Sequence, residues 1–268
     1  MRRILFEKTG NAIYISHLDL MRLFQRAFKR GGLNLKHTQG FSPRAMVSIA
    51  LPMSVGVESR CEILDYELVG QDELSFDEIR DRLNASLPAG VRVLEVYDSE
   101  RKPRDLTHLD IAIGMEYDAG VPQGCADAIR ELFARESIIV TKRGKNGPVD
   151  QDIIPMIFNL QVTELSGQEL QITARVCAQN PSLNPQLMVT AIEKELPQCK
   201  PDFSRIFRRE AIASDGTIFR KPRSLASLIE GGGPRRGGGS VPNEKTLPQS
   251  ATLTAPSERG PRESYIRF

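Results

Sequence analysis

Four cationic side chains, spaced to share one side of a helix, are the clearest chemical signal in the chain. They lie within residues 17–30, where apolar residues recur at the i, i+3 and i+4 spacing of a buried helical face. The opposite side then carries Arg22, Arg26, Lys29 and Arg30. Because Arg22 and Arg26 are like charges one turn apart, an anionic ligand would relieve their repulsion. The pattern therefore predicts a surface that binds phosphate groups.

The same helix has a second interpretation, in which carboxylates of this chain neutralise the cations. Asp19 lies three residues after the cap residue Ser16, so we expect its carboxylate to take part in capping the helix start rather than to neutralise the arginines. A neighbouring strand that carries Glu62, Asp65 or Glu67 would then supply the negative charge. The sequence leaves these two interpretations open.

The loop after this helix combines residue types that bind single-stranded nucleic acid. Its sequence, Gln39-Gly40-Phe41-Ser42-Pro43-Arg44, follows Lys36 and His37. Backbone amides freed by Gly40 can bind phosphate together with Arg44, and the ring of Phe41 can stack on a base. The alternative is an ordinary turn that buries Phe41 in the core.

A second basic loop lies at residues 142–147 and carries Lys142, Arg143 and Lys145. It is similar to a hairpin tip that contacts phosphate, although the GxxxxGK[ST] spacing of a P-loop is missing. The alternative is a solvated loop without a ligand.

His17 is the one histidine for which the sequence suggests catalysis. It begins the predicted helix, three residues after Tyr14, and a helix N-terminus disfavours the imidazolium form. A neutral His17, with Tyr14 or Lys36 as helper, could cleave RNA without a metal by activating a 2′-hydroxyl group. The alternative is a histidine that only forms local hydrogen bonds. We expect a binding protein rather than an enzyme, with metal-independent RNA cleavage as the alternative.

The composition excludes several classes of protein. Of the 268 residues, 40% are hydrophobic and 26% are charged, which is typical of a chain with a folded core. No apolar run is long enough for a membrane span, and the first ten residues are too polar for a signal peptide, so we expect a cytoplasmic protein. Four scattered cysteines and three histidines predict neither a disulfide framework nor a metal site. The net charge of +2 conceals nine lysines and arginines against two acidic residues in positions 1–50.

The elements that must position these residues follow a βαββαβ order in the first half. Strands are predicted at Arg3–Lys8, Met46–Leu51, Cys61–Leu68 and Val91–Tyr97, with helices at His17–Arg30 and Phe76–Leu87. The second half repeats the order more loosely. Its predicted strands are Ile111–Tyr117, Ser137–Thr141, Ile154–Thr163, Glu169–Cys177 and Ile206–Ile212, and its predicted helices are Pro122–Arg135 and Pro185–Leu196.

This order predicts an α+β fold of two tandem ferredoxin-like (β-α-β-β-α-β) domains, residues 1–104 and 105–221. Residues 222–268 are rich in glycine, proline and serine and have no sustained periodicity. Such a segment cannot bury enough apolar surface to offset its ordering entropy, so we expect a disordered tail.

Three segments of the first half resemble a known bacterial family. They are Tyr14–Arg22, Gln39–Pro43, and Leu51-Pro52 with Val55-Gly56-Val57-Glu58. On this basis the chain is similar to the radical-SAM-linked proteins, which are found beside or fused to radical S-adenosylmethionine (SAM) proteins. The resemblance implies an accessory protein that binds RNA or presents substrate to a partner radical SAM enzyme. S-adenosylmethionine and the iron–sulfur cluster are then expected only on that partner, because the CxxxCxxC motif is missing here.

A more distant resemblance is to the RAMP-type CRISPR repeat-processing endonucleases, which also use tandem ferredoxin-like domains. Some of them place a catalytic histidine near the first helix, which would correspond to His17, with Tyr14 or Lys36 as helpers. Their glycine-rich C-terminal signature is not found before residue 222, which argues against cleavage and leaves RNA binding open. A protein–protein adaptor, with an acidic partner covering the basic helix face, is the third hypothesis.

Overall fold

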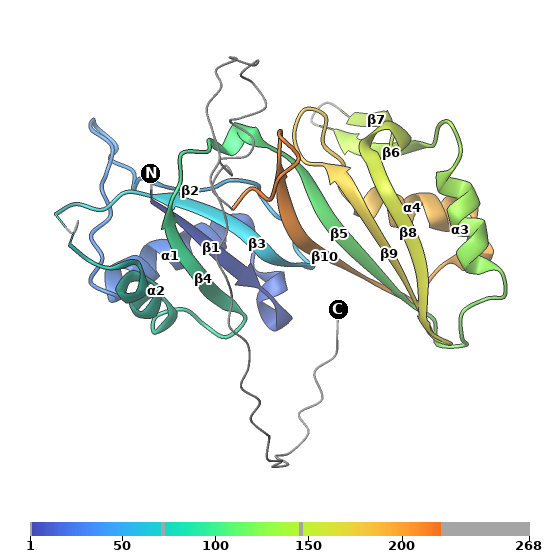
Figure 1. The fold of residues 1–268 in the computed structure, drawn as a ribbon, viewed down its shortest axis with the longest axis horizontal. Coiled ribbons are helices and arrows are strands. Elements are labelled where there is room, and N and C mark those ends of the chain that lie inside the picture. Colours follow the sequence, from blue (N-terminus) through green and yellow to red (C-terminus); the bar gives the residue numbers. More distant parts are fainter. Residues whose placement is uncertain (1, 71–72, 145–146, 221–268) are drawn as a thin grey trace, which may run out of the picture. The chain divides into compact units, whose positions relative to one another are not determined.

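The structure is a computed structural model that describes residues 2–70, 73–144 and 147–220. Within these ranges the chain forms an α+β fold with four α-helices and ten β-strands (Figure 1). The first half contains β1 (Arg2–Lys8), the 3-10 helix η1 (Gly10–Tyr14), α1 (His17–Arg30), β2 (Val47–Ile49), β3 (Val57–Tyr66), α2 (Phe76–Asn84) and β4 (Val91–Asp98). After η2 (Pro103–Asp105), the second half contains β5 (Leu106–Glu116), α3 (Cys125–Phe133), β6 (Ile139–Gly144), β7 (Gly147–Asp152), η3 (Ile154–Met156), β8 (Ile157–Ser166), β9 (Glu169–Cys177), α4 (Gln186–Glu195), η4 (Pro197–Cys199) and β10 (Phe203–Ala213).

One sheet runs through both halves, in the order β4-β1-β3-β10-β5-β9-β8, and β2 also pairs with β3. Its neighbouring strands are antiparallel except at the junction of the halves, where β3 and β10 are parallel. That junction consists of three residue pairs, Ile206 with Val57, Phe207 with Glu58, and Arg208 with Ser59. The opposite end of β3 pairs with β2 instead.

Each half has the same strand order. The first half reads β4-β1-β3-β2 and the second reads β10-β5-β9-β8, so in both cases the fourth, first, third and second strands are neighbours. This is the antiparallel arrangement expected of a βαββαβ unit. The second half differs by the β6–β7 hairpin, which follows α3 in the sequence, precedes β8, and forms a separate two-stranded sheet. The division into two ferredoxin-like domains at residue 104 stays a prediction.

Two hydrophobic clusters hold the helices on the sheet. One joins α1 and α2 to β1, β3 and β4 through residues such as Phe6, Phe24 and Leu83. The other joins α3 and α4 to the second half of the sheet, and it also includes Leu5 and Ile63 from the first half. The second cluster therefore crosses the junction, and burial of this apolar surface favours the association of the halves.

Helix α1 has the bounds that its local signals predict. The backbone N–H of Asp19 donates to the hydroxyl of Ser16 at 3.2 Å, which caps the first turn, and the helix ends at Gly31. The strand β7 is not among the elements expected from the sequence. None of the helices in the described ranges is both long and apolar enough to cross a membrane. The predicted disordered tail, residues 222–268, lies outside the described residues.

Candidate nucleic-acid interface

Helix α1 presents its four cations to solvent because its opposite side is fixed in the core. The ring of Phe24 packs edge-on against Phe6 with centroids 4.7 Å apart, and Phe28 lies 5.0 Å from the ring of Tyr66. These contacts fix the rotation of the helix about its axis. The side chains on its outer face are all exposed, namely Arg22, Arg26, Lys29 and Arg30. We call these four side chains the α1 basic face.

Two of the four cations have partners within the chain. Nη1 of Arg22 lies 3.1 Å from Oδ1 of Asp19, and Nη2 of Arg30 donates to the carbonyl oxygen of Ser86 at 2.9 Å. The carboxylate of Asp19 therefore accepts from the hydroxyl of the cap residue Ser16 and also pairs with Arg22, which corrects the expectation that the cap alone occupies it. Bonds from Ser16 and Arg22 hold the pKa of Asp19 below its usual range. Among the described residues, neither Arg26 nor Lys29 has a carboxylate within ion-pair distance.

The strand carboxylates that could have neutralised the α1 basic face are paired elsewhere. Asp65 accepts two bonds from the guanidinium of Arg3, at 2.5 and 3.0 Å, and both residues are buried. Glu62 lies 3.2 Å from Arg208 of β10. Glu67 lies 2.8 Å from Nζ of Lys36. None of these three acids is paired with a cation of α1, so the carboxylate that partly neutralises the helix is Asp19, through Arg22.

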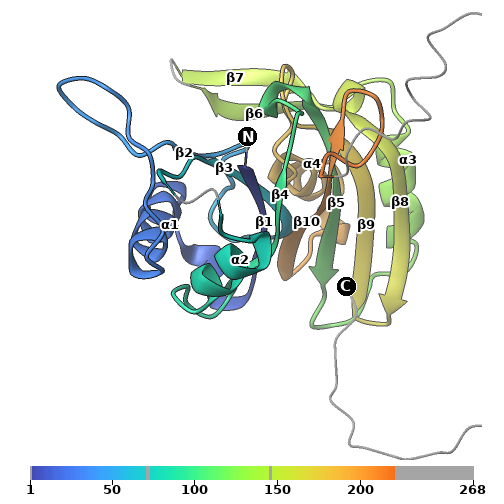
Figure 2. The ribbon, with the colours of Figure 1, turned by 60° about the vertical axis from the view of Figure 1, so that its left-hand side comes forward.

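Residues 36–46 form a hairpin-like loop beyond the end of α1, which we call the 36–46 hairpin. His37 and Ala45 form an isolated bridge, and the N–H of Thr38 donates to the carbonyl of Arg44 at 2.9 Å. Figure 2 shows it as a long blue loop that extends away from α1 and β2.

Residues 36–44 of the 36–46 hairpin are all exposed. Phe41 is fully exposed, so the alternative in which this ring is buried is wrong. The other predicted ligand residues of the loop, Gln39, Gly40 and Arg44, are exposed too. An apolar ring that has no packing partners is a ready contact for a ligand.

The three residues proposed for catalysis are not brought together. Tyr14 on η1 and His17 at the first position of α1 lie near one end of the helix, whereas Lys36 follows its other end. The 14 residues of α1 span about 20 Å, so Lys36 is out of reach of His17. Lys36 is also paired with Glu67. Lys36 is therefore not placed to act with His17 in catalysis.

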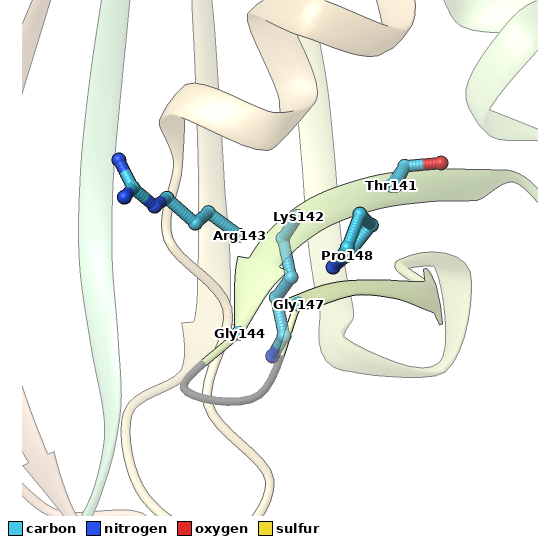
Figure 3. Close-up of a pocket in the computed structure, with 6 residues that line it drawn as sticks. All are labelled: Thr141, Lys142, Arg143, Gly144, Gly147 and Pro148. Carbon is cyan, nitrogen blue, oxygen red and sulfur yellow. The ribbon is translucent and has the colours of Figure 1, made fainter.

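The basic loop of the second half is a separate feature. Lys142 and Arg143 lie on β6, beside a shallow cavity of about 520 Å³, and Lys145 lies outside the described residues. Figure 3 shows the two cationic side chains pointing away from each other, as neighbours on a strand do. Figure 1 shows β6 and β7 beside α4, on the side of the picture opposite to α1. This hairpin therefore does not extend the α1 basic face.

A cleft of about 550 Å³ lies where the two halves meet, and we call it the seam cleft. It is lined by η1, including Tyr14, by residues 54–58, by the start of α4, and by residues 203–206 of β10. Phe203 was not expected to take part in a site. The alternation Phe203-Ser204-Arg205-Ile206 was the available signal, because it places Phe203 and Arg205 on one face of a strand.

Metal binding has no grouped ligands in the part of the chain that the structure describes: no three His, Cys, Asp or Glu side chains come together there. Cys61, Cys125, Cys177 and Cys199 are each buried and free.

None of the curated proteins compared with the chain matches it. One similar solved structure is a chain of "Crystal Structure of a Cbf5-Nop10-Gar1 Complex", with 12% identity and a TM-score of 0.46 over 78% of this chain and 48% of that one, so this chain spans about half of its length. Another is "Crystal Structure of an Unknown Protein from Galdieria sulphuraria", with 14% identity and a TM-score of 0.21 over 76% of this chain and 94% of that one. Residues 2–185 match the family described as "Uncharacterized protein conserved in bacteria (DUF2344)". Since this match covers more than half of the sequence, the chain belongs to the DUF2344 family.

Proposed function

We propose that this protein binds single-stranded RNA along the α1 basic face and the 36–46 hairpin. The observation that carries the proposal is the state of Arg26 and Lys29, which are exposed and have no ion pair with any described carboxylate. The three acids that the sequence suggested as partners, Asp65, Glu62 and Glu67, are paired with Arg3, Arg208 and Lys36. Unpaired cations on a fixed helix attract a polyanion, because phosphate contacts release counterions.

The exposed ring of Phe41 supports a single strand rather than a duplex. Bases in a single strand are free to stack on an aromatic side chain, whereas the bases of a duplex are already stacked on one another. Arg44, on the same hairpin, would contact the backbone beside that base. The helix and the hairpin together supply both elements of single-strand binding, a cationic track and a stacking platform.

The resemblance to radical-SAM-linked proteins supports a further part of the proposal. The RNA-binding protein would act as an accessory that delivers its ligand to a radical SAM enzyme on another chain, which would carry the S-adenosylmethionine and the cluster. Co-expression of the full chain with the radical SAM proteins of its own source organism tests this part. A stoichiometric complex on size-exclusion chromatography is expected, and separate elution of the two proteins at micromolar concentration would remove this part alone.

Salt-dependent binding of a labelled single-stranded RNA to the full chain tests RNA binding itself. Arg26→Ala with Lys29→Ala removes two phosphate contacts, so the slope of log affinity against log salt should fall by about 1.4. Between about 50 and 200 mM salt, the affinity of the native protein should then fall roughly sevenfold more than that of the variant. Fluorescence anisotropy measures both slopes.

A matched control removes the same charge elsewhere. Arg135→Ala with Lys194→Ala deletes two exposed cations next to α3 and on α4, away from α1 in Figure 1. This control should retain the native slope. Equal slopes for the two double variants would mean that net charge alone drives binding, and absence of binding by the native protein at low salt would refute the proposed function.

A further inference from the structure

The seam cleft is built from both halves of the chain, at the end of the β3–β10 pairing that joins them in the described residues. Its lining includes the apolar residues Ile13, Val57 and Ile206, the last two from β3 and β10 and both buried. Tyr14 from the first half and Phe203 from the second also line it, exposed by 67% and 53%. Two large aromatic side chains that line one cleft and are more than half exposed are typical of a ligand site rather than of a core.

The segment that carries Tyr14 is held rigidly. The side chain of Lys8 is buried, and its Nζ donates to the carbonyl oxygens of Ile13 at 3.1 Å and Ile15 at 2.8 Å, on either side of Tyr14. The N–H of Gly56 donates to the same carbonyl of Ile13 at 3.0 Å. A buried charge is costly unless its bonds are satisfied, and here those bonds fix η1. The exposure of Tyr14 is therefore a feature of an ordered segment, which lowers the entropy lost on binding.

The charges of the seam cleft favour an uncharged ligand group over a phosphate. It contains one acid, Glu58, whose Oε1 accepts from the N–H of Gly10 at 3.4 Å. Its one cation, Arg205, is paired with Glu116 and lies 5.5 Å from the ring centroid of Phe203. The other polar side chains that line the cleft include the amides of Asn11 and Gln186, which offer donors and acceptors together.

We infer that the seam cleft binds one planar heteroaromatic ring, a nucleobase. The apolar lining residues and the two exposed aromatic side chains suit the faces of such a ring, and the amides suit its hydrogen-bonding edge. This inference rests on the proposed function, because η1 directly precedes α1 and the base would belong to the RNA that follows the α1 basic face. The backbone would then leave the seam cleft along α1 toward the 36–46 hairpin.

Nucleosides test the inference without the contribution of phosphate. Adenosine, guanosine, cytidine and uridine are titrated separately into the full chain at millimolar concentration, with ribose as the ligand that lacks a base, and binding is followed by saturation-transfer NMR on the ligand. At least one nucleoside should bind and ribose should not. Tyr14→Ala and Phe203→Ala should each weaken binding by about fivefold or more, as expected for the loss of a stacking contact. Tyr14→Phe, which keeps the ring, should bind as the native protein does.

The outcomes separate this inference from the proposed function. Arg26→Ala with Lys29→Ala should leave nucleoside binding unchanged, because these cations contact phosphates. If no nucleoside binds, or if Tyr14→Ala and Phe203→Ala bind as tightly as the native protein, the inference is overturned even when RNA binding retains its salt slope. Because both aromatic side chains are largely exposed, circular dichroism of the variants should match that of the native protein, which excludes unfolding as the cause.

Discussion

Substitution of Gly90 tests how tightly the segment next to the seam cleft is held. Gly90 has a φ of +85°, and its carbonyl accepts from the N–H of Thr9 at 2.8 Å. An added Cβ would lie 2.4 Å from the carbonyl oxygen of Thr9 and 2.9 Å from the Cβ of Ala12. The first neighbour is backbone, so Gly90→Ala forces either β4 or η1 to move.

The cost has two parts. A side chain in the left-handed region costs about 1–2 kcal/mol, and forcing an extra methyl into a packed site adds about 1–3 kcal/mol. Gly90→Ala should therefore lower the free energy of unfolding by about 2–5 kcal/mol. Gly124→Ala is the matched control, because its φ is +74° but an added Cβ meets nothing within 4 Å. It should cost only about 1–2 kcal/mol.

Equilibrium urea unfolding of the full chain measures both losses by linear extrapolation. In the folded fraction of the Gly90→Ala protein, nucleoside binding at the seam cleft should also weaken, because η1 carries Tyr14. Equal losses for the two glycine variants would show that η1 yields freely, and the reasoning that it presents Tyr14 rigidly would fail.

Two further predictions concern groups buried in the sheet. Asp65→Asn leaves the fully buried guanidinium of Arg3 without its counter-charge, so it should lower the free energy of unfolding in urea by about 3–5 kcal/mol. Glu195→Gln is the control at an exposed ion pair and should lower it by less than about 1 kcal/mol. Burial raises the pKa of Tyr97 to about 12, above the unfolded value of about 10, so its contribution to stability is complete below about pH 10 and is lost as the pH rises toward 12. The free energy of unfolding should fall less steeply with rising pH in Tyr97→Phe than in the native protein. Identical slopes for the two proteins would contradict the assignment.

The helical part of the interface was predictable because its signals are local. Ser16, the apolar spacing and Gly31-Gly32 fix the start, face and end of α1 within one stretch of sequence. The strand β7 gives no such signal: its sequence GPVDQD has one large apolar side chain, and pairing with β6 makes it a strand. A sequence pattern cannot predict a strand that forms only because it pairs with a neighbouring strand.

The exposure of Phe41 and the pairing of the strand acids could not be predicted for a different reason. Both depend on neighbours distant in the sequence. Arg3 and Asp65 are directly opposite in the β1–β3 register, so their ion pair follows from strand pairing that the residue types alone do not specify. The seam cleft likewise combines residues near positions 14, 56 and 204, which only the completed sheet brings together.

The position of β10 has a consequence for the order in which the molecule forms during synthesis. It is the last strand of the described chain, yet it lies in the middle of the sheet between β3 and β5. On the ribosome, residues 57–59 must keep an unpaired edge until residues 206–208 emerge. A nascent chain that stops before residue 203 would already carry the α1 cations but not the second wall of the seam cleft. Translation itself would thus separate in time the surface proposed for the RNA backbone from the pocket proposed for its base.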